Sequence, residues 1–173
     1  MAEKSIIGIE KVEWGACGAA GAMGGVLAEI GLLVPDSVRM TMEEPDKTEL
    51  YVEGSDAPYI TIPKAKRTRQ IVFETRDVDP ASLVKFFGGS VNTDVWSAPT
   101  SETPIEQSVQ LTSVTSGGFH YTIKVPRGLV RASMDAPFST EETANVKITI
   151  DVLLPLDGGG SPLSPVQIEK VAA

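Results

Sequence analysis

Apolar and polar residues alternate with a period of two along much of this chain. The alternation is clearest in five stretches, residues 38–42, 49–53, 71–74, 119–125 and 146–152. Successive side chains of a β-strand point to opposite faces, so each stretch predicts a strand with one apolar and one polar face. Because such stretches recur along most of the chain, we expect a mainly β fold.

Short turn signals separate several of these predicted strands. Ser116-Gly117-Gly118 lies between the runs 105–115 and 119–125, and Pro126-Arg127-Gly128 lies between the latter run and residues 129–134. Parallel neighbours need a crossover of a dozen or more residues, so links this short predict antiparallel pairing. The expected architecture is an antiparallel β-sandwich or a barrel-like sheet.

One short α-helix is predicted over about residues 80–87. Asp79 can cap its first amide groups, Pro80 suits the first helical position, and Gly88-Gly89 can end it. Phe86 and Phe87 follow Leu83 at spacings of three and four, so the three side chains share a helical face. We expect this face to close one end of the β core.

The remaining segments bear on domain organisation. We expect an irregular loop over the glycine-rich segment that begins at Gly15, leading into a strand around residues 26–33. From about residue 155 the proline and glycine content predicts a flexible C-terminal extension. No interior linker divides the chain, so residues 1–173 are predicted to form a single domain with one core.

The charge of the chain limits the partners that it can bind. The net charge is −8, which repels phosphate backbones and anionic lipid surfaces, so tight nucleic-acid binding is not expected. The basic cluster Lys64, Lys66, Arg67 and Arg69 has acidic flanks and no interleaved aromatic residues, and it is interpreted as a solvated strand edge or loop. The sequence shows no signal-peptide pattern and no membrane span, so we expect synthesis in a cytoplasm and no membrane partner.

The sequence predicts no catalytic, cofactor-binding or metal-binding residues. His120 and Cys17 are the only histidine and cysteine, too few for a histidine-activated nucleophile or a zinc site. The glycines between Gly15 and Gly25 lack the Gly-Lys-Ser/Thr ending of a phosphate-binding loop and are interpreted as close packing. We therefore expect no cofactor and no enzymatic activity.

Carboxylates are the one chemically versatile group that is plentiful. They occur in pairs as Glu43-Glu44, Asp77 with Asp79, and Glu141-Glu142. Paired acids can hydrolyse glycosides or hold calcium, but both need defined separations or six or more oxygen ligands. Solvated acidic surface is the favoured interpretation, and a hydrolase that uses paired acids stays open as a further alternative.

In layout the chain resembles the tail tube proteins of long-tailed bacteriophages, which are related to the tube protein of type VI secretion systems. The resemblance covers nearly the whole sequence and rests on the order of its segments. These are Ile6 to Gly15, Asp36 to Glu43, Thr48 to Gly54 leading into Pro58-Tyr59-Ile60, Ile71 to Glu74, Leu83 to Gly89, Trp96 to Pro99, Ile105 to Leu111, and the last strand before Pro155.

The resemblance implies a tail tube fold whose subunits join strands into hexameric rings, with the rings stacked into a tube that conducts DNA without binding it specifically. Further partners would be other tail proteins, namely a tape measure protein, a terminator and, in a contractile tail, a sheath. The protein would be located in the tail of the virion. In that family a hairpin near the first strands contacts the adjacent ring, and the matching stretch here is residues 43–66. The alternative is a β-sandwich adhesion or ligand-binding module without catalytic activity.

Overall fold

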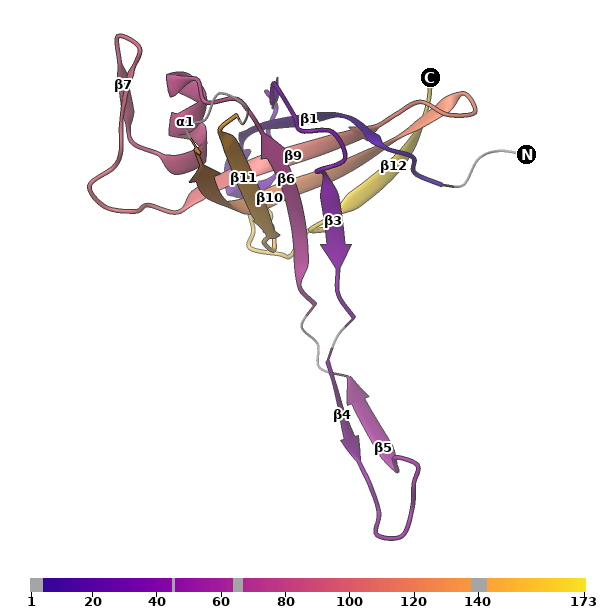
Figure 1. The fold of residues 1–173 in the computed structure, drawn as a ribbon. Helices are drawn as coiled ribbons and strands as arrows, with labels where there is room; N and C mark the ends of the chain where they lie inside the picture. Colours follow the sequence, from indigo (N-terminus) through magenta and orange to yellow (C-terminus); the bar gives the residue numbers. More distant parts are fainter. Residues whose placement is uncertain (1–4, 45, 64–66, 138–142) are drawn as a thin grey trace.

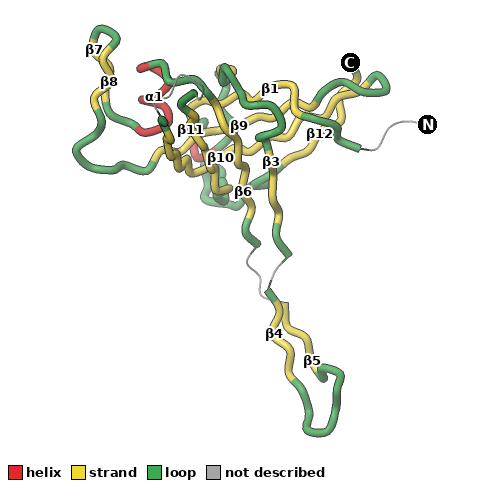
Figure 2. The backbone as a smooth tube through the Cα atoms, viewed as in Figure 1, coloured by secondary structure: helices red, strands yellow, loops and turns green. Residues whose placement is uncertain are grey.

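The computed structural model describes residues 5–44, 46–63, 67–137 and 143–173, and they form a mainly β, antiparallel structure with one short α-helix (Figures 1 and 2). The helix is α1 (Pro80–Phe87), and one 3₁₀ turn, η1, spans Ala19–Gly21. The strands are β1 (Ile9–Ala16), β2 (Ala28–Glu29), β3 (Arg39–Met42), β4 (Lys47–Leu50), β5 (Ile60–Pro63), β6 (Arg69–Thr75), β7 (Ser90–Asn92), β8 (Val95–Ser97), β9 (Ile105–Ser113), β10 (Phe119–Asp135), β11 (Asn145–Val152) and β12 (Gln167–Ala172).

Eight of these strands form one sheet in the order β2-β1-β9-β10-β11-β6-β3, and β12 pairs with the first half of β10. The other four strands form two hairpins outside this sheet, β4–β5 and β7–β8. The body is defined here as the large sheet with α1. Figure 1 shows the β4–β5 hairpin reaching away from the body on the side of β3 and β6, whereas both ends of the described chain lie near β1 and β12.

The 17-residue strand β10 bends the sheet into two halves. Its first part pairs with β12 and β9, and its second part pairs with β11. On β10 the register advances by three residues from Val125 to Gly128, whereas on β9 it advances by two, which is one extra residue and therefore a β-bulge. Bulges increase the local bend and twist of a strand, so the two halves can turn toward each other.

The predicted turn at residues 126–128 was therefore wrong: β10 continues through it. Pro126 has no amide hydrogen for the ladder, and its carbonyl instead accepts a hydrogen bond from Ser108 Oγ at 2.5 Å. Gly128 is needed because a Cβ at this position would collide with Ile150 Cγ2 on β11. In contrast, the hairpin predicted at residues 116–118 is confirmed, with Gly117 and Gly118 at φ of +59° and +80°.

The core lies between the two halves of the sheet. Val12, Trp14, Val109, Leu111, Ile123 and Val125 face it from one half, and Ile71, Phe73, Val130, Val146, Ile148 and Ile150 face it from the other. The Trp14 and Phe73 rings meet edge to face across the halves, with centroids 6.5 Å apart. The period-two prediction is thus confirmed for residues 71–74 and for 146–150, where the alternate apolar side chains are buried. In the predicted stripe 119–125, Ile123 and Val125 are buried, whereas Phe119 and Tyr121 are only half-buried.

The predicted helix is confirmed as α1, which covers one end of this core. Asp79 Oδ2 accepts a hydrogen bond from the Ala81 amide at 3.0 Å, and Gly88 ends the helix at a φ of +75°. Leu83 and Phe86 are buried, and the Phe86 ring lies 5.1 Å from that of Trp14. No helix of the described segments is long and apolar enough to cross a membrane.

Two further predictions need correction. The expected strand over residues 26–33 shortens to β2: Ala28 and Glu29 are in register with β1, the Ile30 amide donates to the Val12 carbonyl at 2.8 Å, and Val26 is 85% exposed. The C-terminal segment returns to the sheet after residue 155: Pro155 is buried, and β12 pairs with β10 from Phe119 to Lys124. The alternation in β12 is too short and too charged to have indicated a strand.

Candidate interaction surface

The residues first considered for chemistry lie apart. His120 is on β10 opposite Val171 of β12, whereas Cys17 follows β1 near the bulge of β10. In the parts of the chain that the structure describes, no three His, Cys, Asp or Glu side chains are placed to hold a metal ion. Glu141 and Glu142, like Lys64 and Lys66, lie outside the described residues.

Asp77 and Asp79 are close together, but both serve the start of α1. Asp77 accepts hydrogen bonds from the Asp79 amide at 3.1 Å and from Ser82 Oγ at 2.7 Å, while Asp79 caps Ala81. Each carboxylate is therefore engaged by donors of its own segment. This arrangement satisfies amide groups at the start of the helix, which is an ordinary structural use of the two carboxylates.

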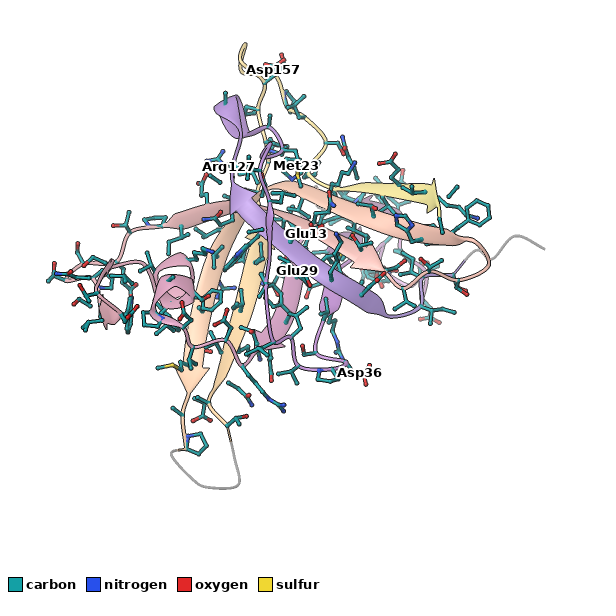
Figure 3. The ribbon with its side chains drawn as sticks, turned by 90° about the horizontal axis from the view of Figure 1, so that it is seen from above. Glu13, Met23, Glu29, Asp36, Arg127 and Asp157 are labelled. Carbon is teal, nitrogen blue, oxygen red and sulfur yellow. The ribbon has the colours of Figure 1, made fainter. Side chains whose placement is uncertain are left out.

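The sheet brings together another acidic pair that the sequence pattern did not indicate. Glu13 of β1 and Glu29 of β2 are directly opposed in the register. Both are labelled in Figure 3, which views the molecule from above. Lys11 Nζ lies 3.2 Å from Glu13 Oε1, and Gln110 donates to Glu13 Oε2 at 3.2 Å. Like charges in directly opposed positions destabilise a strand pair, and these two donors offset part of that repulsion.

Cys17 is half-buried beside Ser108, Glu106 and Arg127. Its surroundings act on the thiol in opposite directions: burial raises its pKa, whereas the Ser108 hydroxyl and the Arg127 charge lower it, and burial prevails. The sequence showed no basic neighbour for Cys17, because Arg127 reaches it only through the fold. A thiol with a raised pKa is a poor nucleophile, so the geometry favours a packing role.

The β4–β5 hairpin exposes an unusual number of apolar side chains. It is called the arm here and is defined as residues 47–63. In its register Leu50 opposes Ile60 and Thr48 opposes Ile62, so these four side chains share one face. Val52, two residues beyond the end of β4, is a further apolar side chain of the arm. The arm therefore carries an apolar face on a two-stranded ribbon, and Figures 1 and 2 show it standing clear of the body.

Nothing among the described residues covers that apolar face. Leu50, Val52, Ile60 and Ile62 are 44–53% exposed, and Tyr59 at the tip is 73% exposed. Isolated two-stranded hairpins are marginally stable in water, and exposed apolar clusters mark interaction sites. The strand predicted over residues 49–53 is confirmed only in part, because β4 ends at Leu50 and residues 51–53 lie outside it.

The opposite face of the arm is polar and internally paired. Glu49 accepts from Lys47 Nζ at 2.6 Å and from the Tyr51 hydroxyl at 2.6 Å. Hydrogen bonding to Lys47, and then to Tyr51, lowers the pKa of Glu49, while Glu49 raises the pKa of both partners. This face is suited to solvent, which leaves the apolar face as the side that a partner would cover.

A second apolar surface lies on the body. A groove of about 740 Å³ opens between β3 and the strands β1, β9, β10 and β12, and its residues are mostly apolar. Ile6, Met42, Val114 and Ile168 line it and are 42–54% exposed. This groove is where the core of the bent sheet remains open to solvent, and it explains why the alternation predicted for residues 38–42 ends in an exposed Met42.

The β7–β8 hairpin gives a contrast to the arm. Trp96 on β8 packs against Phe87 with ring centroids 6.0 Å apart, and its indole Nε1–H donates to the Gly88 carbonyl at 2.9 Å. This aromatic anchor holds the hairpin to α1. The described residues of the arm have no comparable hydrogen bond or ring contact to the body.

Comparisons with known proteins add no assignment. No protein-family model matches the chain, and no curated protein matches it either.

Proposed function

We propose that this chain is a structural subunit that assembles with copies of itself into stacked hexameric rings, forming a tail tube of a phage or prophage that acts as a conduit for DNA. The observation that carries the proposal is the arm, whose apolar face has no cover within its own chain. A ribbon of this kind gains stability when a second molecule removes the face from water. The arm also occupies the stretch, residues 43–66, that the layout resemblance assigns to contacts between rings.

Two further features support self-assembly. The path of the large sheet ends at β2 and β3 among the described residues, and such edges present unpaired backbone groups that another copy can satisfy. The net charge of −8 would let DNA pass through a bore without adhering to its wall. Other tail proteins, a tape measure protein and a terminator among them, would be the remaining partners.

The test is sedimentation velocity and negative-stain electron microscopy of the purified chain over a concentration series. We expect rings of uniform diameter that stack into tubes as the concentration rises. The matched variant Leu50→Ser/Ile60→Ser/Ile62→Ser keeps the body intact and should remain monomeric with an unchanged circular dichroism spectrum. A wild-type chain that stays monomeric throughout would overturn the proposal and favour the β-sandwich binding module.

A further inference from the structure

The groove on the body has a basic end. Met42, which lines the groove, is directly opposed to Arg69 in the β3–β6 register, so the two side chains lie on the same face. Arg67 precedes Arg69 by two residues and is exposed. Neither arginine forms an ion pair with the described part of the chain. The apolar groove therefore ends, on the side from which the arm projects, beside two arginines that form no ion pair among the described residues.

The tip of the arm has the complementary character. Between Thr48 and Pro63 the chain has three acidic residues, Glu49, Glu53 and Asp56, and no basic residue. Glu49 is already paired with Lys47, whereas Glu53 and Asp56 are exposed at the tip. Tyr59 beside them is a side chain on which arginine stacks well.

We propose that the arm tip of one copy docks in the groove of a second copy, with Glu53 and Asp56 facing Arg67 and Arg69 and the apolar face of the arm against Met42 and its groove neighbours. This inference rests on the proposed self-assembly and names the surface that receives the arm. The groove also holds two carboxylates, Glu10 and Asp36. They repel the acidic tip, so the tip must enter with its acids at the arginine end, which fixes the direction of docking.

The arm and the groove are different surfaces of one chain, so their contact is heterologous. Such contacts are not self-limiting pairs: each copy offers one arm and one groove, and copies continue into closed rings or open stacks. The arm points away from the body that carries its own groove (Figure 1), which favours a neighbouring copy over an intramolecular contact. Docking would thus cover exposed apolar area on both partners and bring their opposite charges together in one step.

Charge reversal with complementation tests this docking. One variant, Glu53→Lys/Asp56→Lys, reverses the tip, and a second, Arg67→Glu/Arg69→Glu, reverses the groove end. Each alone should raise the concentration for half-assembly by roughly tenfold or more at about 50 mM salt, because like charges would then meet. An equimolar mixture of the two should co-assemble, since reversed tips meet reversed grooves.

The matched control is Arg76→Glu/Lys147→Glu, which makes the same change in net charge as Arg67→Glu/Arg69→Glu, but at exposed positions outside the groove. It should assemble like the wild type, and circular dichroism should show that all variants are folded. Two results would overturn the docking and leave the proposed function intact. In the first, the wild type assembles and both reversal variants assemble equally well; in the second, the equimolar mixture of the two variants fails to regain assembly. A wild type that never assembles would overturn both.

Discussion

The body and the arm are built from the same kind of strand but differ in what covers the apolar side. In the body, Phe73 and Ile148 lie on directly opposed strands and are fully buried between the two halves of the sheet. In the arm, Leu50 and Ile60 are directly opposed in the same way and stay about half exposed. Alternation therefore specifies a strand with two unlike faces, and the tertiary or quaternary context decides whether the apolar face is a core or a contact surface.

The largest expected effect separates the two regions by stability. Phe73→Ala should lower the free energy of unfolding by about 3–5 kcal/mol, because it removes a ring that is fully buried against Trp14 and leaves a cavity. Ile62→Ala on the arm should change it by less than about 0.5 kcal/mol in the monomer. Urea denaturation at a protein concentration below assembly measures both, and equal losses at the two positions would contradict the division into body and arm.

A smaller loss is expected where the body bends. Gly128→Ala places a methyl group against Ile150 on β11 and should cost about 1–3 kcal/mol, since the two strands cannot separate without disturbing the buried stripe of β11. Gly54→Ala, at the arm tip, meets no atom but also has a positive φ of +83°, so its strain is local. The midpoint temperature of thermal unfolding should therefore fall for Gly128→Ala but not for Gly54→Ala. An unchanged midpoint for Gly128→Ala would mean that the bulge is not tightly packed.

The fold was predictable where the decisive signals are local. Asp79, Pro80 and Gly88 mark the ends of α1 in the sequence itself. The apolar stripe from Val146 to Ile150 can be predicted from the alternation of apolar and polar residues alone. The bulge at Pro126 and Gly128 was misread as a turn, because the need for a glycine arises from Ile150, which is distant in sequence.

The candidate surface was predictable only in part. The resemblance in segment order predicts that residues 43–66 contact another copy. The apolar face shared by Leu50 and Ile60, however, depends on a strand register that the sequence does not specify. The groove joins Ile6, Met42, Val114 and Ile168 from four separate segments, so no local pattern could indicate it. The pairing of β12 with β10 likewise depends on long-range contacts.

The ion pair between Glu106 and Arg127, which lies in the body, should make the stability of the protein depend on pH. Arg127 donates two hydrogen bonds to Glu106, at 2.7 and 2.8 Å, and this bonding lowers the pKa of Glu106. A carboxyl whose folded pKa is depressed contributes stability above its unfolded pKa and loses it as the pH falls through the folded value. Glu106→Gln should therefore be less stable than the wild type at neutral pH, with the difference disappearing in acid.

Chemical denaturation from neutral pH down to about pH 3 measures this dependence. Glu102→Gln is the control, because Glu102 is an exposed glutamate a few residues away on the same segment and forms no ion pair with the described residues. A difference between Glu106→Gln and the wild type that stayed constant with pH would assign the loss to packing rather than to the ion pair.

The smallest effect concerns the β7–β8 hairpin, which is anchored where the arm is not. Its turn places Thr93 and Asp94 at φ of +45° and +63°, the backbone of a type I′ turn, which β-branched threonine adopts poorly. Thr93→Asn should stabilise the hairpin by about 0.5–1 kcal/mol, because asparagine tolerates this conformation far better. Since Trp96 ties the hairpin to α1, the gain should slow amide hydrogen exchange in β7 and β8 while exchange in the arm stays fast. If amide exchange in β7 and β8 did not slow, the turn would not limit the stability of this hairpin. The contacts of Trp96 would then account for its greater stability relative to the arm.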